Sequence, residues 1–335
     1  MKEKYRKITG SQYKKYWVFV LVLCSLAFPQ VFQSGLIIRI GVTTLVYALV
    51  SMGNMVIVGY CGLLQCGHGA FYGLGAYVSA ILATALDCPF WICFLAAIVG
   101  SAVFGFLISL PCLRVQVDFL SLMTIAFAQI FTTVVTNWKS VTGGPGGIAA
   151  IPAPQLFGYK FSSQTSYYYL VLVIMIIVYW ALHNLMQSPI GRAMQAVRDD
   201  EMGARSMGIN ANHFKILAFV MGSVVAGIAG SLMAHYLRYI GPSSFTLDVS
   251  LLFMQMIILG GLGSLSGAVA GAAFFTIIPE VIRPLAVYRM GLGGAIMLIV
   301  VLLRPQGLMG SKAFAGTGGI LKDFKWFRKR RYNGK

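Results

Sequence analysis

The chain contains 335 residues, of which 58% are hydrophobic, 38 are glycine and only 10% are charged, and its mean hydropathy is +0.79. Soluble proteins carry about 25% charged residues, so this composition excludes a soluble globular domain and a disordered chain and predicts a polytopic membrane protein. The net charge of +17 does not indicate nucleic-acid binding, because the basic residues gather in two tails and one central loop.

Apolar runs along the chain have the length of membrane spans, about 17–25 residues. The stretch 249–282 is too long for one span and is interrupted by GGLGSLSG at 260–267, so we expect two shorter helices there. The runs predict an all-α membrane bundle of about ten spans (8–10), at 17–33, 36–58, 67–86, 90–111, 118–137, 167–187, 214–238, twice within 249–282, and at 290–303.

The distribution of Lys and Arg predicts which loops face the cytoplasm, because cytoplasmic loops carry an excess of both residues. With ten spans and both termini inside, 20 of the 26 basic residues fall on the cytoplasmic side. We therefore expect an N-in, C-in protein with a basic cytoplasmic tail (1–16), a transmembrane permease domain (17–303) and a second basic cytoplasmic tail (304–335).

A loop at 138–166 is expected on the outer, periplasmic side. It is rich in Gly, Pro and Ser and contains TGGPGG at 142–147. Glycine and proline disfavour a continuous helix, so this loop is predicted to form a turn-rich cap.

The loop at 188–213 is expected in the cytoplasm. Pro189 and Gly191 are predicted to end the preceding helix, and AMQAVRDDEMGARSM (193–207) to form one amphipathic helix that stops at Gly208. Such a helix is either a connector on the bilayer surface or a docking site for a soluble partner. Its expected apolar face comprises Met194, Val197, Met202 and Met207, and its expected solvated residues are Arg198, Asp199, Asp200, Glu201 and Arg205.

Motifs for catalysis are lacking from the sequence. The chain has no HExxH, GxSxG or GxxxxGK[ST] motif, its six cysteines form no CxxC pair, and its four histidines are far apart in sequence. We therefore expect neither an enzyme nor a metal site.

An ion-coupled carrier retains ionisable residues inside its spans, whereas these apolar runs carry them only near their ends. The energy for transport is expected to come from a partner protein.

Two glycine-rich segments lie near the starts of predicted spans, GLLQCGHGAFYGLGAYVSA (62–80) and GGLGSLSGAVAGAAFF (260–275). Small residues let helix backbones approach closely, which is one interpretation of both segments. The other is a pair of broken helices in two weakly related halves that face a central pathway, because glycine-interrupted spans in corresponding positions indicate a transport site.

Several blocks in fixed order resemble the permease subunits of bacterial ATP-binding-cassette importers for branched-chain amino acids, the LivM-type subunits. The resemblance runs from about residue 36 to residue 310. The blocks are GHGAFYGLGAY (67–77), Leu113-Arg114 with DFLSLMTIAFAQI (118–130), TGGPGGI (142–148), GRAMQAVRDDEMGARSMGIN (191–210) with Lys215, Ala218-Phe219 and AGIAG (226–230), GGLGSLSGAVAGAAFF (260–275) with Pro279-Glu280, and Arg304-Pro305-Gln306-Gly307.

The resemblance implies that 192–209 is the coupling loop that docks into a groove of a cytoplasmic ATPase subunit. It also implies a bacterial inner-membrane complex that contains a second related permease as heterodimer partner, two ATPase subunits and a periplasmic or lipid-anchored solute-binding protein. ATP is then bound by the partner subunits, and this chain needs no cofactor. Movement of the loop is expected to pass into spans 167–187 and 214–238 and to switch the pathway between two states.

Three groups of residues are candidates for function, with branched-chain amino acids as the expected cargo. Urea, short amides or a sugar are alternatives within the family, and an ion-coupled carrier is the alternative from another class. Docking to the ATPase is assigned to Arg192, Arg198, Glu201, Ala204 and Gly208, the pathway and its hinges to Gln65, His68, Gly69, Gly73, Gly263, Ser264 and Gly267, and the outer surface to Thr142, Gly143 and Gly144.

Overall fold

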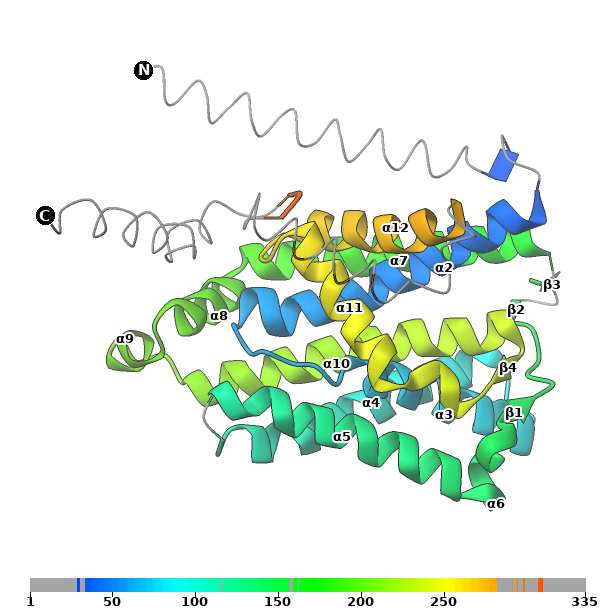
Figure 1. The fold of residues 1–335 in the computed structure, drawn as a ribbon, viewed down its shortest axis with the longest axis horizontal. Coiled ribbons are helices and arrows are strands. Elements are labelled where there is room, and N and C mark those ends of the chain that lie inside the picture. The colour runs from blue at the N-terminus through cyan, green and yellow to red at the C-terminus, as the bar shows by residue number, and fades with distance from the viewer. Residues whose placement is uncertain are drawn as a thin grey trace, which may run out of the picture.

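The computed structural model describes residues 29–30, 34–115, 117–156, 159–161 and 163–281, and in addition 291, 294, 298 and 307–309. Helices dominate this part of the chain, and most of the long ones run along the long axis of the molecule (Figure 1). The long helices are α2 (Gly35–Met55), α3 (His68–Ala85), α4 (Phe90–Cys112), α5 (Val117–Asn137), α7 (Gln164–Gln187), α10 (Ala211–Leu237), α11 (Leu247–Gly260) and α12 (Leu265–Val281).

Shorter elements connect the long helices. The short helices are α6 (Lys139–Thr142), α8 (Pro189–Asp199), α9 (Glu201–Ser206), the π-helix η1 (Val56–Tyr60) and the 3-10 helices η2 (Gly144–Gly146) and η3 (Pro242–Phe245). The strands are β1 (Ile148–Ala149), β2 (Gln155–Leu156), β3 (Tyr159–Lys160) and β4 (Tyr239–Ile240).

The predicted spans between 36 and 282 each coincide with a helix, and 249–282 is divided into α11 and α12 as expected. The helical, multi-pass character is confirmed. The predicted spans 17–33 and 290–303 lie almost wholly outside the described residues, so the total of ten and the side on which the termini lie remain predictions. Six stretches of the described chain are long and apolar enough to cross a membrane: Gly35–Tyr60, Phe90–Cys112, Phe119–Asn137, Gln164–Gln187, Ala211–Leu237 and Pro242–Gly260.

Helix α10 forms the centre of the bundle. It packs most extensively against α3 and α4, and 67% of its apolar span is buried. Glycines allow the backbones to touch, since Gly75 of α3 faces Gly227 of α10, and a Cβ atom on Gly230 would overlap the carbonyl oxygen of Tyr72. At these positions glycine has the packing role that small residues have between membrane helices.

Helices α4 and α5 present apolar side chains on the outside of the bundle. Only 28% of the α4 span and 22% of the α5 span are buried. Exposed side chains include Leu95 and Val99 on α4 and Leu122 and Ile130 on α5. These surfaces are suited to contact with lipid or with another membrane helix.

Two breaks interrupt the helices at the glycine-rich segments. Helix α2 ends in η1, residues 61–67 are not helical, and α3 begins inside the bundle (Figure 1). Residues 261–264 separate α11 from α12, with Gly261 at φ 104° and Gly263 at φ 81°. Glycine adopts such positive φ angles without steric cost. The predicted division of 249–282 into two helices is confirmed. Residues 61–67 connect two helices that were predicted as separate spans, and α3 is continuous through its glycines, so the interpretation of 62–80 as a broken span stays a prediction.

The two long loops lie at opposite ends of the bundle (Figure 1). One end carries the cap, made of α6, η2 and the strands, so 138–166 forms turns and short elements as expected, while its place on the periplasmic side stays a prediction. The sequence did not predict that β1 pairs with β4, which follows α10, and places Ile148 opposite Ile240. Helices α8 and α9 occupy the other end.

Replacing Gly230 by valine is expected to destabilise the protein. The new side chain would meet the backbones of Tyr72 and Ala76, which can move only if α3 and α10 separate. Overpacking of this kind costs about 1–3 kcal/mol, so we expect a lower melting temperature in detergent, measured by intrinsic fluorescence. Gly146→Ala is the matched control, because no atom lies within 4 Å of its added methyl group. Equal losses in both variants would contradict close packing as the cause.

Candidate functional site

The first break brings two predicted pathway residues into the interior. Gln65 lies in the non-helical segment and His68 begins α3, and both side chains are completely buried. His68 Nδ1 lies 3.3 Å from Gln65 Oε1. Gly53 of α2 lies against the same ring, since a Cβ atom there would be 3.2 Å from His68 Nε2.

The backbone of the first break is held by hydroxyl groups from two neighbouring helices. The Cys66 N–H donates to Thr124 Oγ1 on α5 at 3.1 Å. The Gly69 N–H donates to Ser250 Oγ on α11 at 3.0 Å. An interrupted helix leaves backbone groups without intrahelical partners, and α5 and α11 supply partners for two of them.

Buried amides with unused hydrogen-bonding capacity lie beside this break. Both side-chain polar atoms of Asn54, and Nε2 of Gln65, are buried and have no hydrogen-bond partner in the described part of the protein. An unsatisfied buried polar group costs about 1–3 kcal/mol, so these amides are candidates for a functional role. Sequence reasoning missed Asn54, although an amide within the apolar run 36–58 was the available signal.

The second break carries the predicted hinge residues Gly263 and Ser264 and contacts the end of α2. The Gly263 N–H points at Met55 Sδ, 3.2 Å away, and a Cβ atom on Gly59 of η1 would lie 2.9 Å from the Gly263 nitrogen. The Gly267 N–H donates to Ser264 Oγ at 3.2 Å. The structure therefore places the second break against the end of α2 and η1, about 200 residues earlier in the sequence, and η1 leads directly into the first break.

The other predicted pathway glycines lie at helix contacts. A Cβ atom on Gly69 would be 2.5 Å from Ser250 Oγ, and one on Gly73 would be 2.6 Å from the Phe131 ring. Gly267 faces Gly260 across the contact between α11 and α12. In this conformation these three glycines permit close packing, and their role in the pathway stays a prediction.

The coupling segment, residues 188–210, forms two helices and not one. Asp200 separates α8 from α9 with φ −157° and ψ 106°, and its carboxylate accepts a backbone hydrogen bond from the first turn of α9 at 3.1 Å. Asp200 thus caps α9, which is why the prediction of a single helix was wrong. Helix α7 ends at Gln187, just before Pro189, as predicted, although Pro189 and Gly191 then belong to α8. The stop at Gly208, φ 82°, is also confirmed.

The apolar residues of the coupling segment divide between two surfaces. Met194 and Val197 are buried. Met202 and Met207 are 83% and 82% exposed. The four residues therefore do not form the single apolar face that was expected, because the break between α8 and α9 changes the direction of the chain. Ala204, a predicted docking residue, is buried in a small cluster with Val197.

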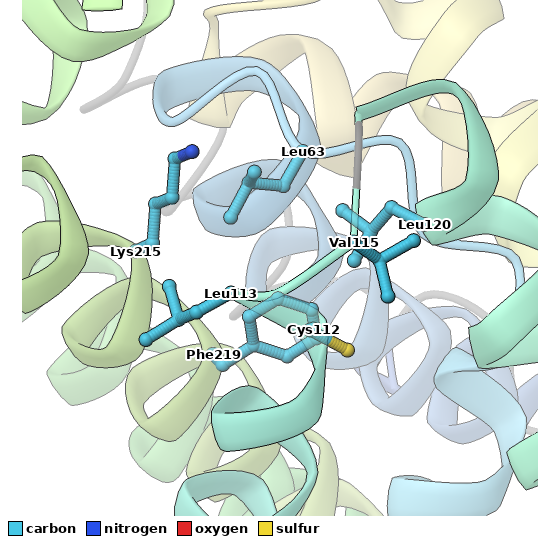
Figure 2. A pocket seen from close by; sticks show the side chains of 7 residues that line it. All are labelled: Leu63, Cys112, Leu113, Val115, Leu120, Lys215 and Phe219. Atoms are coloured by element: carbon cyan, nitrogen blue, oxygen red, sulfur yellow. The ribbon is translucent and has the colours of Figure 1, made fainter.

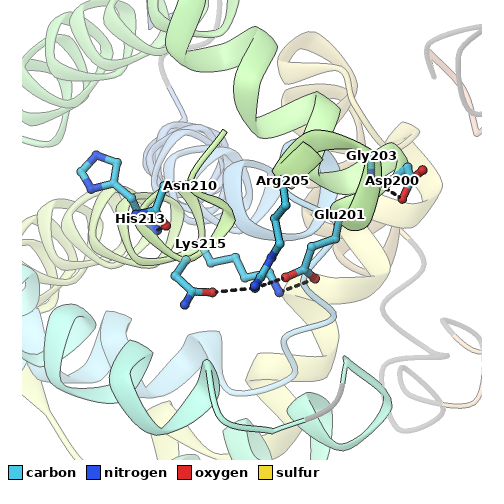
Figure 3. A network of polar contacts seen from close by, with 8 residues as sticks. Asp200, Glu201, Gly203, Arg205, Asn210, His213 and Lys215 are labelled. Carbon is cyan, nitrogen blue, oxygen red and sulfur yellow. Dashed lines mark hydrogen bonds and ion pairs between the residues drawn. The ribbon is translucent and has the colours of Figure 1, made fainter. Parts of the chain in front are cut away.

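Glu201 ties the coupling segment to α10. Its carboxylate lies 2.7 Å from Lys215 Nζ and 2.8 Å from Arg205 Nη2 (Figure 3). Arg205 also donates to Asn212 Oδ1 at 3.0 Å. Burial alone would raise the pKa of Glu201, but the hydrogen bonds from Lys215 and Arg205 outweigh it and hold the pKa below its ordinary value. Glu201 was expected to be solvated, and most of its side chain is instead covered.

The Arg198 side chain points into the protein. Its side chain is only 10% exposed, Nη1 donates to the Gly59 carbonyl at 2.9 Å, and Nη2 lies 2.7 Å from Asp199 Oδ1. The expectation that Arg198 is solvated was wrong because the side chain reaches the end of η1. Arg192 lies on the outside, where it donates to the Gln187 carbonyl at 3.0 Å.

The predicted outer residues shape the cap. The Thr142 hydroxyl is buried and donates to the Val135 carbonyl at 2.6 Å. Gly143 and Gly144 have φ angles of 74° and 60°, which only glycine adopts readily. These residues form the turn that connects α5 to β1, and their contact with a partner stays a prediction.

A small pocket lies at the end of the bundle that bears α8 and α9 (Figure 2). It has a volume of about 10 Å³, room for about one water molecule. Among the described residues that line it, Lys215 alone is charged, and the others include Leu63, Leu120 and Phe219. The pocket is too small for an amino acid. Among the described residues, no group of three His, Cys, Asp or Glu side chains is arranged to hold a metal ion.

Comparison with known proteins identifies the family of the chain. The family model described as branched-chain amino acid transport system / permease component matches residues 36–301. The chain belongs to this family. No solved structure matches the chain significantly.

Three relatives illustrate the similarity of this permease to characterised proteins. It is 33% identical over 326 residues to the high-affinity branched-chain amino acid transport system permease protein LivM of Salmonella typhimurium, and 32% identical to LivM of Escherichia coli K12. Both alignments cover 90% of this chain and 76% of the relative. It is 27% identical over 284 residues to LivH of Escherichia coli K12, covering 79% of this chain and 91% of the relative.

Asn54→Leu tests whether the permease retains the buried amide for transport. Leucine has a similar volume and removes both polar atoms without a partner. We expect the variant to be more stable by about 1–3 kcal/mol, seen as a higher melting temperature in detergent, while uptake of radiolabelled solute falls. Destabilisation of the purified variant would show that the amide is satisfied, and unchanged uptake would show that transport does not need it.

The stability of the permease is expected to depend on Glu201 and on pH. Because the folded-state pKa is lowered, the stabilisation is complete above the ordinary carboxyl pKa of 4.5 and is lost as the pH falls through the lowered value. Glu201→Gln should therefore cost about 1 kcal/mol at neutral pH, and the difference in melting temperature from the unmodified protein should shrink under acidic conditions. A difference that is constant with pH would contradict the ion-pair assignment.

Proposed function

We propose that this permease is the membrane-spanning subunit of an ATP-binding-cassette importer that carries branched-chain amino acids across the bacterial inner membrane. The observation that carries the proposal is the family match over residues 36–301, supported by two LivM relatives that align with 90% of the chain. The sequence has no nucleotide-binding motif of its own. We therefore assign ATP to two cytoplasmic partner subunits, and no cofactor to the permease.

The proposed complex contains a second permease and an extracytoplasmic solute-binding protein. LivM and LivH of Escherichia coli K12 are both described as permease proteins of a high-affinity branched-chain amino acid transport system, and this chain is similar to both. This double similarity supports a heterodimer of related permeases. The exposed apolar faces of α4 and α5 are available for the second permease or for lipid. The cap around Thr142 is the proposed receiving surface for the binding protein.

In the proposed mechanism, the partner ATPase binds the exposed side of the coupling segment. Met202 and Met207 supply an apolar contact on this side, and Glu201 connects α9 to α10 through Lys215. The buried amides beside the first break, Asn54 and Gln65, are the proposed polar contacts for a solute as the pathway opens. Binding of ATP and of solute then biases two states of the helices around the breaks.

Purification in mild detergent tests the proposal directly. We expect two ATPase subunits and a second permease to copurify with this chain, and the reconstituted complex to import leucine only with ATP and the binding protein. Uptake by this chain alone on a proton or sodium gradient would overturn the proposal in favour of an ion-coupled carrier. Competition by urea or short amides, but not by leucine, would keep the class of transporter and change the solute.

The docking surface is tested by a double variant, Met202→Ser with Met207→Ser. Both side chains are more than four-fifths exposed, so the permease is expected to fold normally. Interface positions of this kind cost about 1–4 kcal/mol when truncated, so the amount of copurifying ATPase should fall at least about tenfold. Leu86→Ser is the matched control, because Leu86 is an exposed apolar residue at the opposite end of the bundle. Normal ATPase recovery with the double variant would remove these methionines from the interface.

A further inference from the structure

Arg198 makes a contact that docking to a soluble partner does not explain. Its guanidinium is turned away from the exposed side of the coupling segment and donates to the backbone carbonyl of Gly59 at 2.9 Å. The carboxylate of Asp199, whose side chain is 65% exposed, forms an ion pair with Nη2 of the guanidinium. The bond joins α8 to η1 across a sequence separation of 139 residues.

The contact between Arg198 and Gly59 stabilises the C-terminal end of a helix. The combined helix α2–η1 stops at Tyr60, and the last carbonyl groups of a helix have no intrahelical donors. A cation is also favoured at a helix C-terminus, where the helix dipole is negative. Arg198 supplies both the donor and the charge. Gly62, φ 75°, makes room for it, because a Cβ atom there would lie 2.6 Å from Arg198 Cγ.

The helix end that Arg198 holds is the meeting point of both breaks. η1 leads directly into residues 61–67 and so to Gln65 and His68. Its Gly59 lies against Gly263 of the second break. π-helical turns are wider than α-helical turns and often occur at functional sites in helices. A small displacement of η1 therefore moves the backbone on which both breaks depend.

We propose that Arg198 is a positioning residue that links the coupling segment directly to η1, and through η1 to both broken helices. This inference rests on the proposed function. When the partner ATPase displaces α8, the bond to the Gly59 carbonyl carries η1 with it, and the breaks around Gln65 and Gly263 rearrange. Without this bond the coupling segment still docks and still moves, but the broken helices do not follow, and ATP is hydrolysed without solute import.

The test compares assembly, ATP hydrolysis and import in the complete reconstituted complex. Arg198→Met keeps the length of the side chain and removes the donor, and Gly62→Ala displaces the guanidinium from the other side of the contact. For both variants we expect normal recovery of the ATPase subunits and about a tenfold or greater fall in the amount of leucine imported per ATP hydrolysed. Coupling between two sites in a protein commonly changes an equilibrium by about 5–150-fold, so a fall of this size is reasonable. Arg198→Lys, which retains a donor and the charge, should recover part of the ratio.

Arg114→Met is the control, because Arg114 is an exposed arginine shortly after α4 and lies outside the coupling segment. It should keep the ratio of import to hydrolysis. Loss of the ATPase subunits from the Arg198→Met complex would overturn the inference by placing Arg198 at the partner interface. An unchanged ratio in Arg198→Met and Gly62→Ala would also overturn it.

A second measurement follows η1 itself. Cys61 comes directly after η1 and is 3% exposed, so its rate of maleimide labelling reports movement there once the other cysteines are replaced by alanine. We expect the rate to differ between nucleotide-free and vanadate-trapped complexes, and the difference to vanish with Arg198→Met. A rate independent of nucleotide in the parent complex overturns the inference. Absence of ATPase subunits from the unmodified complex overturns the proposed function as well, which distinguishes the two failures.

Discussion

The structure depends on satisfying backbone hydrogen bonds where helices are interrupted inside a membrane protein. Hydrocarbon offers no partner to a free N–H or carbonyl group, so a break is tolerated only where other parts of the protein supply partners. Thr124 and Ser250 do this for the N–H groups at the start of α3, and Arg198 does it for a carbonyl at the end of η1. These three side chains come from three different elements. The first break is therefore also the point at which α5, α11 and the coupling segment are joined.

Close backbone contact is the second consequence of the small residues near the breaks. Gly75 against Gly227, and Gly260 against Gly267, leave no room for side chains. Tight packing of this kind makes the helices rigid neighbours and leaves the non-helical segments as the places where the bundle can rearrange. The buried amides of Asn54 and Gln65 lie at such a place, so hydrogen-bonding capacity and freedom to rearrange coincide.

Local signals in the sequence predicted most of the helices correctly. The run at 90–111 became Phe90–Cys112 and the run at 118–137 became Val117–Asn137, because apolar length alone defines a membrane span. GGLGSLSG predicted the break before α12 because glycine is needed for the positive φ angles there. The coupling segment was predicted less well. Helical periodicity assumed one axis from 193 to 207, whereas Asp200 caps a second helix and turns Met202 outward.

The amino-acid sequence by itself determined that this protein is a multi-pass membrane permease, where most of its helices begin and end, and that 249–282 is divided into two helices. The length and hydropathy of the apolar runs, the positions of glycine and the distribution of charge are properties of the sequence itself. They can therefore be interpreted without knowing any tertiary contact. Only the tertiary structure decided that η1 contacts the second glycine segment, that Arg198 caps η1, and that β1 pairs with the chain after α10. These features join residues far apart in the chain, and such pairings depend on how whole helices pack against each other.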